Sequence, residues 1–489
     1  MDAGCATTDS RHDLLVHHSG PCHINKLPYD ALSHVFLASL TSSVSRPNIR
    51  SSPVVLGRIC RSWRKLSLEM PLLWNRIVGM AIIPPHLQDE ASMTAELEKD
   101  ILAFDEYLAR SQRSPLDIFM LYVTPGVDTP PPYFVTKVSA IVLKILPHSQ
   151  QWRNIILNIP DESAQTIFSQ LASGVPRLTS LMVSEPNIIH QRPTLQINLS
   201  SAHQLECLHI LVPTEINWSI TVMHQMRELD VKPTSVSSFL QCIDQCPSLT
   251  SVEFRGDVRT MSEPLTEFHI RRLSSLVKIR LDELDQNLFS GLLDSLHLPV
   301  LKQLDLRVTG GVSDSSSFLR FLTQSQPPLK ILSIIVPGMR TAELIHFLRH
   351  IPLLTVLRTD MAYFSDDIIQ QFLIPSSIHA GSVLCPNLMS LWLLGKTEGA
   401  CHSAAKVVVH RWHNASERIA RIRQVWVSGW EWLSFLHCDG IIKCSEEGLQ
   451  LSRSASWINY CEIMKFLPFS ILIPLITGKT GQFETELPS

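Results

Sequence analysis

The chain has 489 residues, of which 45% are hydrophobic and 18% charged, and its formal net charge is −3. This composition is typical of a globular protein that buries a large core, and the length corresponds to roughly two to four domains. The small net charge excludes a protein that binds polyanions over its whole surface. The eleven cysteines are odd in number and irregularly spaced, so no disulfide framework is expected.

The two ends of the chain show no targeting or membrane-spanning pattern. Residues 1–23 are polar and lack the apolar segment of a secretory signal, so we predict a disordered tail there. The longest apolar run, 466–476, is too short to cross a bilayer and contains two prolines. We therefore expect a protein of the cytoplasm or nucleus that does not bind membranes, with a C-terminal tail or atypical cap over 456–489.

A small helical module is predicted over residues 24–80. Pro28 suits the first turn of a helix, where its missing N–H costs no hydrogen bond, and Leu32 and Phe36 follow on one helical face. A second helix is predicted to begin at Pro53 and to end before Pro71.

The stretch GRICRSWRKLSLEMPLLWNRI, which includes most of that second helix, contains two tryptophans and several basic residues. Such a stretch could bind nucleic acid, or it could belong to a helical module whose aromatic residues form core or docking contacts. Trp63 lies on the apolar stripe, whereas Arg61 and Lys65 fall outside it, so the spacing favours the second interpretation. Residues 46–76 hold seven Lys or Arg against one acid, and residues 88–106 hold seven acids against one Lys, which suggests that the two blocks are neighbours.

A helix is predicted near 92–111, within a linker that spans 81–114. Beyond it, the pattern L-x-x-L-x-Φ, where Φ is apolar, recurs at steps of 21 to 34 residues between amphipathic stretches. This period is typical of leucine-rich repeats, in which each unit contributes one strand and one helix. The copies are LTSLMV (178–183), LECLHI (205–210), MRELDV (226–231), LTSVEF (249–254), LVKIRL (276–281), LKQLDL (301–306), LKILSI (329–334), a looser LTVLRT from 354, and LMSLWL (388–393).

The predicted fold class is therefore α/β. We expect the all-α module to be followed over 115–455 by a divergent, leucine-rich-repeat-like solenoid, with parallel strands on its concave face and helices outside. No repeat can be assigned between 396 and 455.

The N-terminal module resembles an F-box, and more narrowly the F-box-like domain of the large protein families of mushroom-forming fungi, which usually precedes degenerate leucine-rich repeats. The resemblance implies that the module docks to the Skp adaptor of a cullin–RING ubiquitin ligase, while the downstream domain holds a protein substrate. The residues that match, and that would form the Skp-docking set, are Leu27, Pro28, Leu32, Val35, Phe36, Leu56, Ile59, Cys60, Trp63, Leu73 and Trp74.

The repeats also predict a site on the concave face. In each copy the apolar positions point inward, so the residues between them point to the concave side. Alignment of the second apolar position predicts two rows of charged side chains. The first row is Asp230, Glu253, Arg280 and Asp305, and the second is Lys232, Arg255, Asp282 and Arg307. We interpret these rows as a partner-recognition surface; the alternative is simple cross-strand pairing on a solvated sheet.

Several short motifs imitate catalytic or metal sites. TGKTG (477–481) lacks the first glycine of a P-loop, and neither HRWH (410–413) nor the pair Cys242 and Cys246 has a second ligand pair at zinc spacing. No metal, cofactor or catalytic residue is therefore expected.

We interpret the chain as the non-catalytic, substrate-recognition adaptor of a Skp–cullin–F-box ligase that binds no nucleic acid. Three alternatives remain open: a repeat scaffold whose module does not engage a ligase, an enzyme built on an α/β solenoid, and a nucleic-acid binder.

Overall fold

The computed structural model describes residues 27–40, 53–82, 89–124, 129–184, 194–218, 222–256, 269–284, 286–308, 316–364, 368, 371–372, 383–395, 400–416, 419–428 and 431–454. The two predicted tails, 1–23 and 456–489, lie outside the described residues, as does TGKTG.

Within the described residues, fifteen strands form one parallel sheet. Along most of the sheet, each strand pairs with the strands that precede and follow it in sequence; β5 pairs only with the second half of the long β6. The strands of this sheet are β1 (Arg76–Ile82), β2 (Leu116–Val123), β3 (Trp152–Asn158), β4 (Ser180–Val183), β5 (Leu195–Asn198), β6 (Cys207–Asn217), β7 (Glu228–Pro233), β8 (Ser251–Arg255), β10 (Lys278–Leu284), β12 (Gln303–Val308), β13 (Ile331–Ile335), β14 (Val356–Asp360), β15 (Ser390–Leu394), β16 (Gln424–Ser428) and β17 (Gln450–Ser454). A separate parallel pair is formed by β9 (Arg271–Arg272) and β11 (Leu296–His297).

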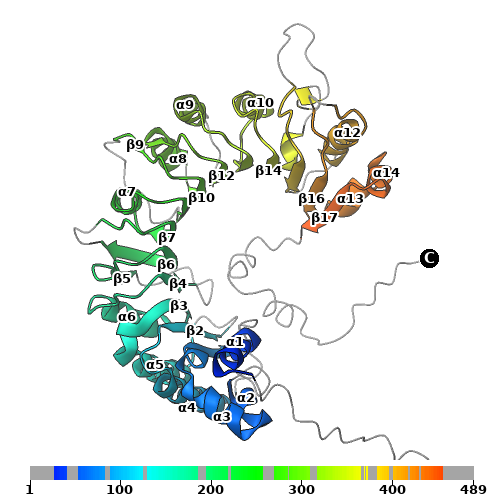
Figure 1. The fold of residues 1–489 in the computed structure, drawn as a ribbon. Helices are drawn as coiled ribbons and strands as arrows, with labels where there is room; N and C mark the ends of the chain where they lie inside the picture. Colours follow the sequence, from blue (N-terminus) through cyan, green and yellow to red (C-terminus); the bar gives the residue numbers. More distant parts are fainter. Residues whose placement is uncertain are drawn as a thin grey trace, which may run out of the picture.

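The sheet curves into an arc, with its strands on the inner side and the helices on the outer side (Figure 1). The chain is therefore a mixed α/β protein with a long parallel sheet, as predicted. The helices are α1 (Tyr29–Leu40), α2 (Pro53–Ile59), α3 (Arg61–Glu69), η2 (Pro71–Leu73), α4 (Glu90–Ser111), α5 (Pro132–Ile145), η4 (Leu146–Gln151), α6 (Asp161–Leu171), α7 (Val236–Gln245), α8 (Gln286–Asp294), α9 (Ser316–Ser325), α10 (Thr341–Arg349), η5 (Met361–Tyr363), α12 (Ala400–His413), α13 (Trp432–Leu436) and α14 (Ile441–Glu446).

The recurring apolar pattern produces the strands and the core together. In the copy at 301–306, Leu301 precedes β12, and Leu304 and Leu306 lie on its helix-facing side; all three are almost completely buried. The residues between them, Gln303 and Asp305, point to the other side because side chains alternate along a strand. Each copy therefore buries its leucines between the sheet and the outer helices and leaves its polar residues on the concave face.

The sheet extends beyond the predicted repeats at both ends. At its start, β1 lies within the range predicted to be all-α and pairs along its whole length with β2. The helix predicted as a linker, α4, connects β1 to β2 and packs on β1 and α5, so it belongs to the first unit of the sheet. At the other end, β16 and β17 continue the same sheet through the stretch where no repeat could be assigned.

The acidic block at 88–106 contacts different basic residues from those we expected. Glu98 pairs with Lys137 at 2.7 Å, and Asp105 pairs with Lys144 at 2.9 Å, so these carboxylates join α4 to α5. These ion pairs do not involve the basic block at 46–76, although α4 does pack against η2 within that range.

The N-terminal helices pack as a small module onto α4. The Phe36 and Trp63 rings lie 4.7 Å apart between α1 and α3. Trp74 donates its indole N–H to the Ser67 carbonyl at 2.7 Å, and its ring meets that of Tyr107 on α4 at 5.1 Å. Trp74 thus connects the module to the first unit of the sheet.

Candidate functional site

The predicted Skp-docking residues divide into a buried and a surface group. The buried group forms the core of the N-terminal module, where its side chains pack against one another. It consists of Leu32, Phe36, Leu56, Trp63, Leu73 and Trp74. Leu27, Pro28, Val35 and Ile59 lie on the surface, and Cys60 is half-buried.

Cys60 has a structural role that the sequence pattern did not reveal. Its backbone is extended, so it separates α2 from α3 where we predicted one helix, and its sulfur caps α3 by accepting from the Trp63 N–H at 3.5 Å. Hydrogen bonds from Ser62 and from the Trp63 backbone lower the pKa of this thiol.

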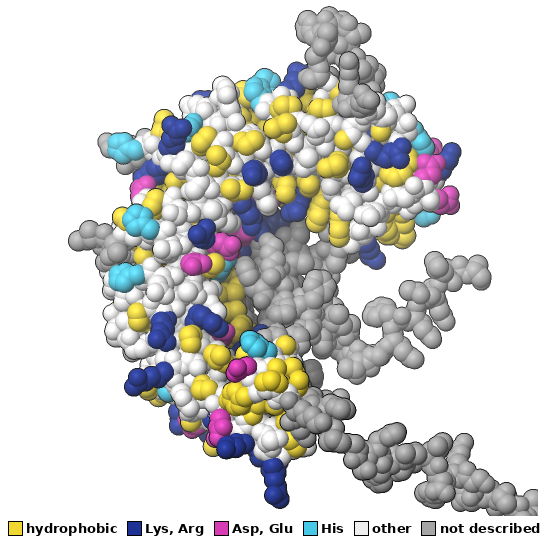
Figure 2. Space-filling model, in the orientation of Figure 1, with side chains coloured by type: hydrophobic (Ala, Val, Ile, Leu, Met, Phe, Trp, Pro, Cys, Tyr) yellow, Lys and Arg dark blue, Asp and Glu magenta, His cyan; other side chains and the backbone are white. Residues whose placement is uncertain are grey.

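An exposed apolar surface remains on the module, and Figure 2 shows hydrophobic side chains gathered there around α1. Its members lie on α1, α2, α3 and η2 and just before α1, and several lie off the apolar stripes on which the prediction relied. We call this set the module surface: Leu27, Tyr29, Val35, Val54, Ile59, Leu68 and Leu72, each at least 40% exposed. Exposed apolar residues grouped in this way commonly mark a protein-binding site.

The basic residues of the opening stretch are exposed as well. Arg58, Arg61, Arg64 and Lys65 are all exposed, and Arg64 donates to the Gly57 carbonyl at 2.8 Å. Both tryptophans of the stretch are buried, so neither presents a ring on which a base could stack.

On the concave face, the sheet register places the predicted first row side by side. Asp230 is opposite Glu253, Glu253 is opposite Arg280, and Arg280 is opposite Asp305. This is the order that alignment of the apolar positions predicts. In the second row the register pairs Arg255 with Asp282, but the register between β10 and β12 shifts between Leu281 and Leu284, so Asp282 and Arg307 are not paired as predicted.

The rows form one network of ion pairs across β7, β8, β10 and β12. Arg255 contacts Asp230 through two nitrogens, at 3.2 and 3.0 Å. Glu253 accepts from Lys278 at 2.6 Å, and Arg280 donates to Asp282 at 2.8 Å.

The remaining members of the two rows make fewer contacts within the network. Arg307 is 3.8 Å from Asp282, and Asp305 accepts from Gln303 at 2.7 Å. Among the described residues, no carboxylate lies within ion-pair distance of Lys232. The acids and bases of the network therefore largely neutralise one another.

His209 on β6 extends this network and was not part of the prediction. It lies 3.6 Å from Glu228 and 3.8 Å from Asp230. Burial alone would lower the pKa of His209, but Asp230, Cys207 and Glu228 outweigh it and raise the pKa to about 11. Burial opposes ionisation of Asp230 as well, yet His209 and Arg255 hold its pKa below the ordinary value. Both groups are thus charged at neutral pH.

A second group missed by the sequence analysis lies farther along the same row. The Arg358 guanidinium is 4.3 Å from the centre of the Trp392 ring, and the Trp392 and Trp426 rings stack 4.6 Å apart at 19°. We call these three side chains the aromatic stack. The letters LMSLWL and RQVWVS contain both tryptophans, but only the strand register brings them together.

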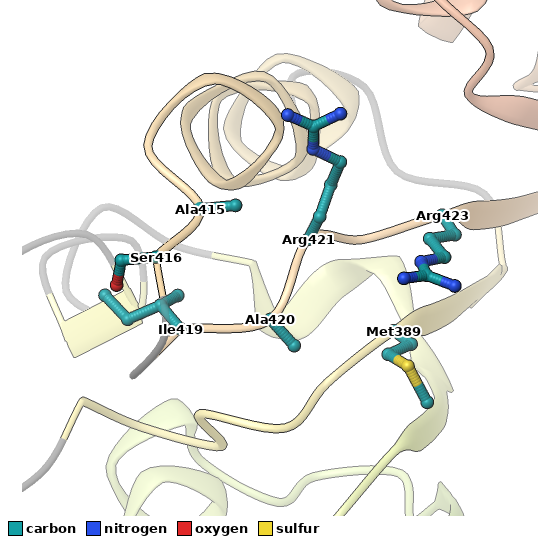
Figure 3. A pocket seen from close by; sticks show the side chains of 7 residues that line it. All are labelled: Met389, Ala415, Ser416, Ile419, Ala420, Arg421 and Arg423. Atoms are coloured by element: carbon teal, nitrogen blue, oxygen red, sulfur yellow. The ribbon is translucent and has the colours of Figure 1, made fainter.

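A pocket of about 310 Å³ opens beside the ends of β15 and β16, and Figure 3 shows its lining. Arg423 reaches over Met389, whereas Arg421 runs beside α12, where its guanidinium lies 4.7 Å from the Trp412 ring. The wall consists of Met389, Ala415, Ser416, Ile419, Ala420, Arg421 and Arg423.

The motifs that resembled metal sites have structural roles. Cys242 and Cys246 are buried, and burial raises the pKa of both thiols, that of Cys242 to about 12. Arg411 of HRWH is fully buried and donates to the carbonyls of Leu384 and Cys385. In the part of the chain that the structure describes, no three His, Cys, Asp or Glu residues are grouped to hold a metal.

Among the helices in the described ranges, none combines the length and the apolar character needed to span a bilayer. No protein-family model matches the chain, and no curated protein matches it either.

Proposed function

We propose that this chain is the non-catalytic, substrate-recognition subunit of a Skp–cullin–F-box ubiquitin ligase. The N-terminal module is an F-box-like domain that docks the Skp adaptor, and the sheet with its outer helices is a divergent, leucine-rich-repeat-like solenoid that holds a protein target. Such a subunit acts by raising the concentration of the target near the ubiquitin-charged enzyme.

One observation carries this proposal: an exposed apolar surface sits on a small helical module that is fixed to one end of a long, curved sheet. The module surface includes Leu27, Val35 and Ile59, which belong to the set that the F-box resemblance assigns to docking. The indole of Trp74 and the pairing of β1 with β2 hold the module to the arc. A rigid connection of this kind suits a receptor that must present its target at a defined position.

The test is a pull-down of the full chain with purified Skp adaptor, using the variants Val35→Asp and Ile59→Asp. Both side chains are exposed, so the substitutions leave the core intact, while a buried interface would have to desolvate the new charge. Leu102→Asp on α4, which is 69% exposed and outside the module, is the matched control. Binding by the wild type and the control, lost in both module variants, is expected; no binding by a folded wild type would overturn the proposal.

A second candidate is a repeat scaffold whose module does not engage a ligase. Six of the eleven residues that carry the F-box resemblance fill the core of the module, so they would be retained by any protein that keeps this helical packing. The same pull-down separates the two candidates, because a scaffold keeps its fold and fails to capture the adaptor.

A further inference from the structure

The aromatic stack occupies the concave face near the C-terminal end of the arc. The register places Arg358 of β14 opposite Trp392 of β15, and Trp392 opposite Trp426 of β16. The strand neighbours of these residues, such as Leu391 and Val425, are buried on the helix side. The three stacked side chains therefore point away from the outer helices, and each is only partly buried.

Arg358 differs from the arginines in the middle of the arc. Arg255, Arg280 and Arg307 each lie within 4 Å of a carboxylate. In the described ranges no carboxylate comes within that distance of Arg358, and its buried Nε has no hydrogen-bond partner there. A guanidinium stacked on an indole ring keeps its N–H edge available for a carboxylate in the plane of the stack.

The second feature of the aromatic stack is the outer ring face of Trp426. One face of its ring stacks on Trp392, and the residue opposite it on the next strand is Ser452 of β17. A serine side chain is too short to cover an indole ring. The outer face of Trp426 is therefore bounded on this row by a small residue, and its size and shape suit another planar group, such as an aromatic or proline ring.

The part of the chain that contains the stack is more basic in sequence than the chain as a whole. Residues 300–428 contain 13 Lys or Arg and 8 Asp or Glu, although the whole chain is net acidic. Lys302, Lys330, Arg421 and Arg423 are exposed at the strand ends or next to them. Figure 2 shows Lys and Arg side chains spread over this part of the arc.

We propose that the aromatic stack binds an extended acidic peptide segment of a partner protein. A carboxylate of the peptide pairs with Arg358, and an aromatic or proline ring a few residues away stacks on the outer face of Trp426. The inference rests on the proposed function, since it names the surface and the chemistry by which the target is held. The charge network around Asp230 then stabilises the sheet and takes no direct part in recognition.

A single-stranded nucleic acid is a poorer fit to the same surface. It would need a basic groove along its backbone, and the concave face carries acids such as Asp305 and Asp360 as well as bases. The two tryptophans also cover each other, which leaves one ring face for a base where several are usual.

The experiment is selection of a displayed library of random heptapeptides on the full-length protein, followed by anisotropy titrations with the selected peptides. Peptides that combine Asp or Glu with an aromatic residue or proline are expected. Arg358→Gln and Trp426→Ala should each weaken their binding by about tenfold or more. Arg349→Gln on α10 and Leu433→Ala on α13 are exposed, lie outside the stack and serve as controls of matched chemistry.

Three outcomes would overturn the inference: no peptide is enriched, the enriched peptides are basic, or both stack variants bind as the wild type does. Displacement of the peptides by a single-stranded oligonucleotide, with steep salt dependence, would also overturn it in favour of nucleic acid. Both variants leave the N-terminal module unchanged, so their capture of Skp should equal that of the wild type. Failure of this inference is thereby separated from failure of the proposed function.

Discussion

Arg255 and Asp230 form a two-point ion pair between adjacent strands, with nitrogen–oxygen distances of 3.2 and 3.0 Å, and only 1% of Asp230 is exposed. A buried carboxylate of this kind depends on its partner, because removal of one charge leaves the other unpaired away from water. The pair therefore has consequences for stability that a surface ion pair would not have.

We expect Arg255→Leu to lower the free energy of unfolding by about 2–4 kcal/mol, since Asp230 would remain buried with only His209 to offset its charge. Urea unfolding at pH 7 measures this loss. The double variant Asp230→Asn/Arg255→Leu should recover part of it, whereas Arg349→Leu on the exposed side of α10 should change stability by less than about 0.5 kcal/mol. Equal, small effects of Arg255→Leu and Arg349→Leu would contradict the assignment. Charge reversal at Arg255 would consequently confuse misfolding with lost recognition.

His209 should make stability depend on pH. Its pKa rises from an ordinary value near 6.5 to about 11 in the folded protein. Because the folded protein holds the His209 proton more tightly than the unfolded chain does, protonated His209 contributes its full stabilisation below about pH 6.5. This contribution declines as the pH rises from there toward 11. His209→Gln should therefore cost about 1–3 kcal/mol at pH 6 and less at pH 9. Urea unfolding at the two pH values checks this. The exposed His203→Gln should show no such difference, and a cost for His209→Gln that grows with pH would refute the assignment.

Trp74 should control how firmly the N-terminal module is held. Trp74→Phe removes the indole N–H that satisfies the Ser67 carbonyl, so we expect a loss of about 1–2 kcal/mol. Limited trypsin digestion should then cleave the module faster, particularly at Arg61, Arg64 and Lys65. Leu72→Ala, an exposed truncation on the same module, is the control. Identical cleavage of the wild type and Trp74→Phe would show that the indole does not hold the module.

Gly79 on β1 should tolerate no side chain. A Cβ at this position would overlap the Tyr122 hydroxyl and come within 2.9 Å of the Phe104 ring, so β1 could no longer approach α4. Gly79→Ala is expected to destabilise the protein by about 1–3 kcal/mol through overpacking, as a lower midpoint in thermal unfolding would show. Gly57→Ala in α2 meets its neighbours at an ordinary 3.5 Å and should be neutral or stabilising by up to about 1 kcal/mol. A neutral Gly79→Ala would show that β1 and α4 can separate at little cost.

The sequence predicted features that depend on local periodicity. The leucines of each repeat identified the strands, and their alignment placed Glu253 beside Arg280, because a strict pattern of buried positions leaves only one register. The helix break at Cys60 was missed because the apolar stripe continues through it. The strand β1 was missed because RIVGMAI follows the helical module and lies outside the recurring pattern.

Site residues were harder to predict than the fold. An apolar stripe does not distinguish a core position such as Phe36 from an exposed one such as Val35, since both satisfy the same spacing. The aromatic stack was missed for a different reason. Trp392 and Trp426 are far apart in sequence, and each is ordinary within its own strand.

The order of strands in the sheet also bears on how the chain is made. Nearly every strand pairs with the strand synthesised shortly before it, so each new unit finds its partner already complete as it leaves the ribosome. The apolar face of the growing end is covered as soon as the next strand and helix emerge, since stacked units contact mainly their neighbours. Synthesis from N- to C-terminus therefore exposes one unfinished edge at a time, and the N-terminal helical module is the first part to be completed.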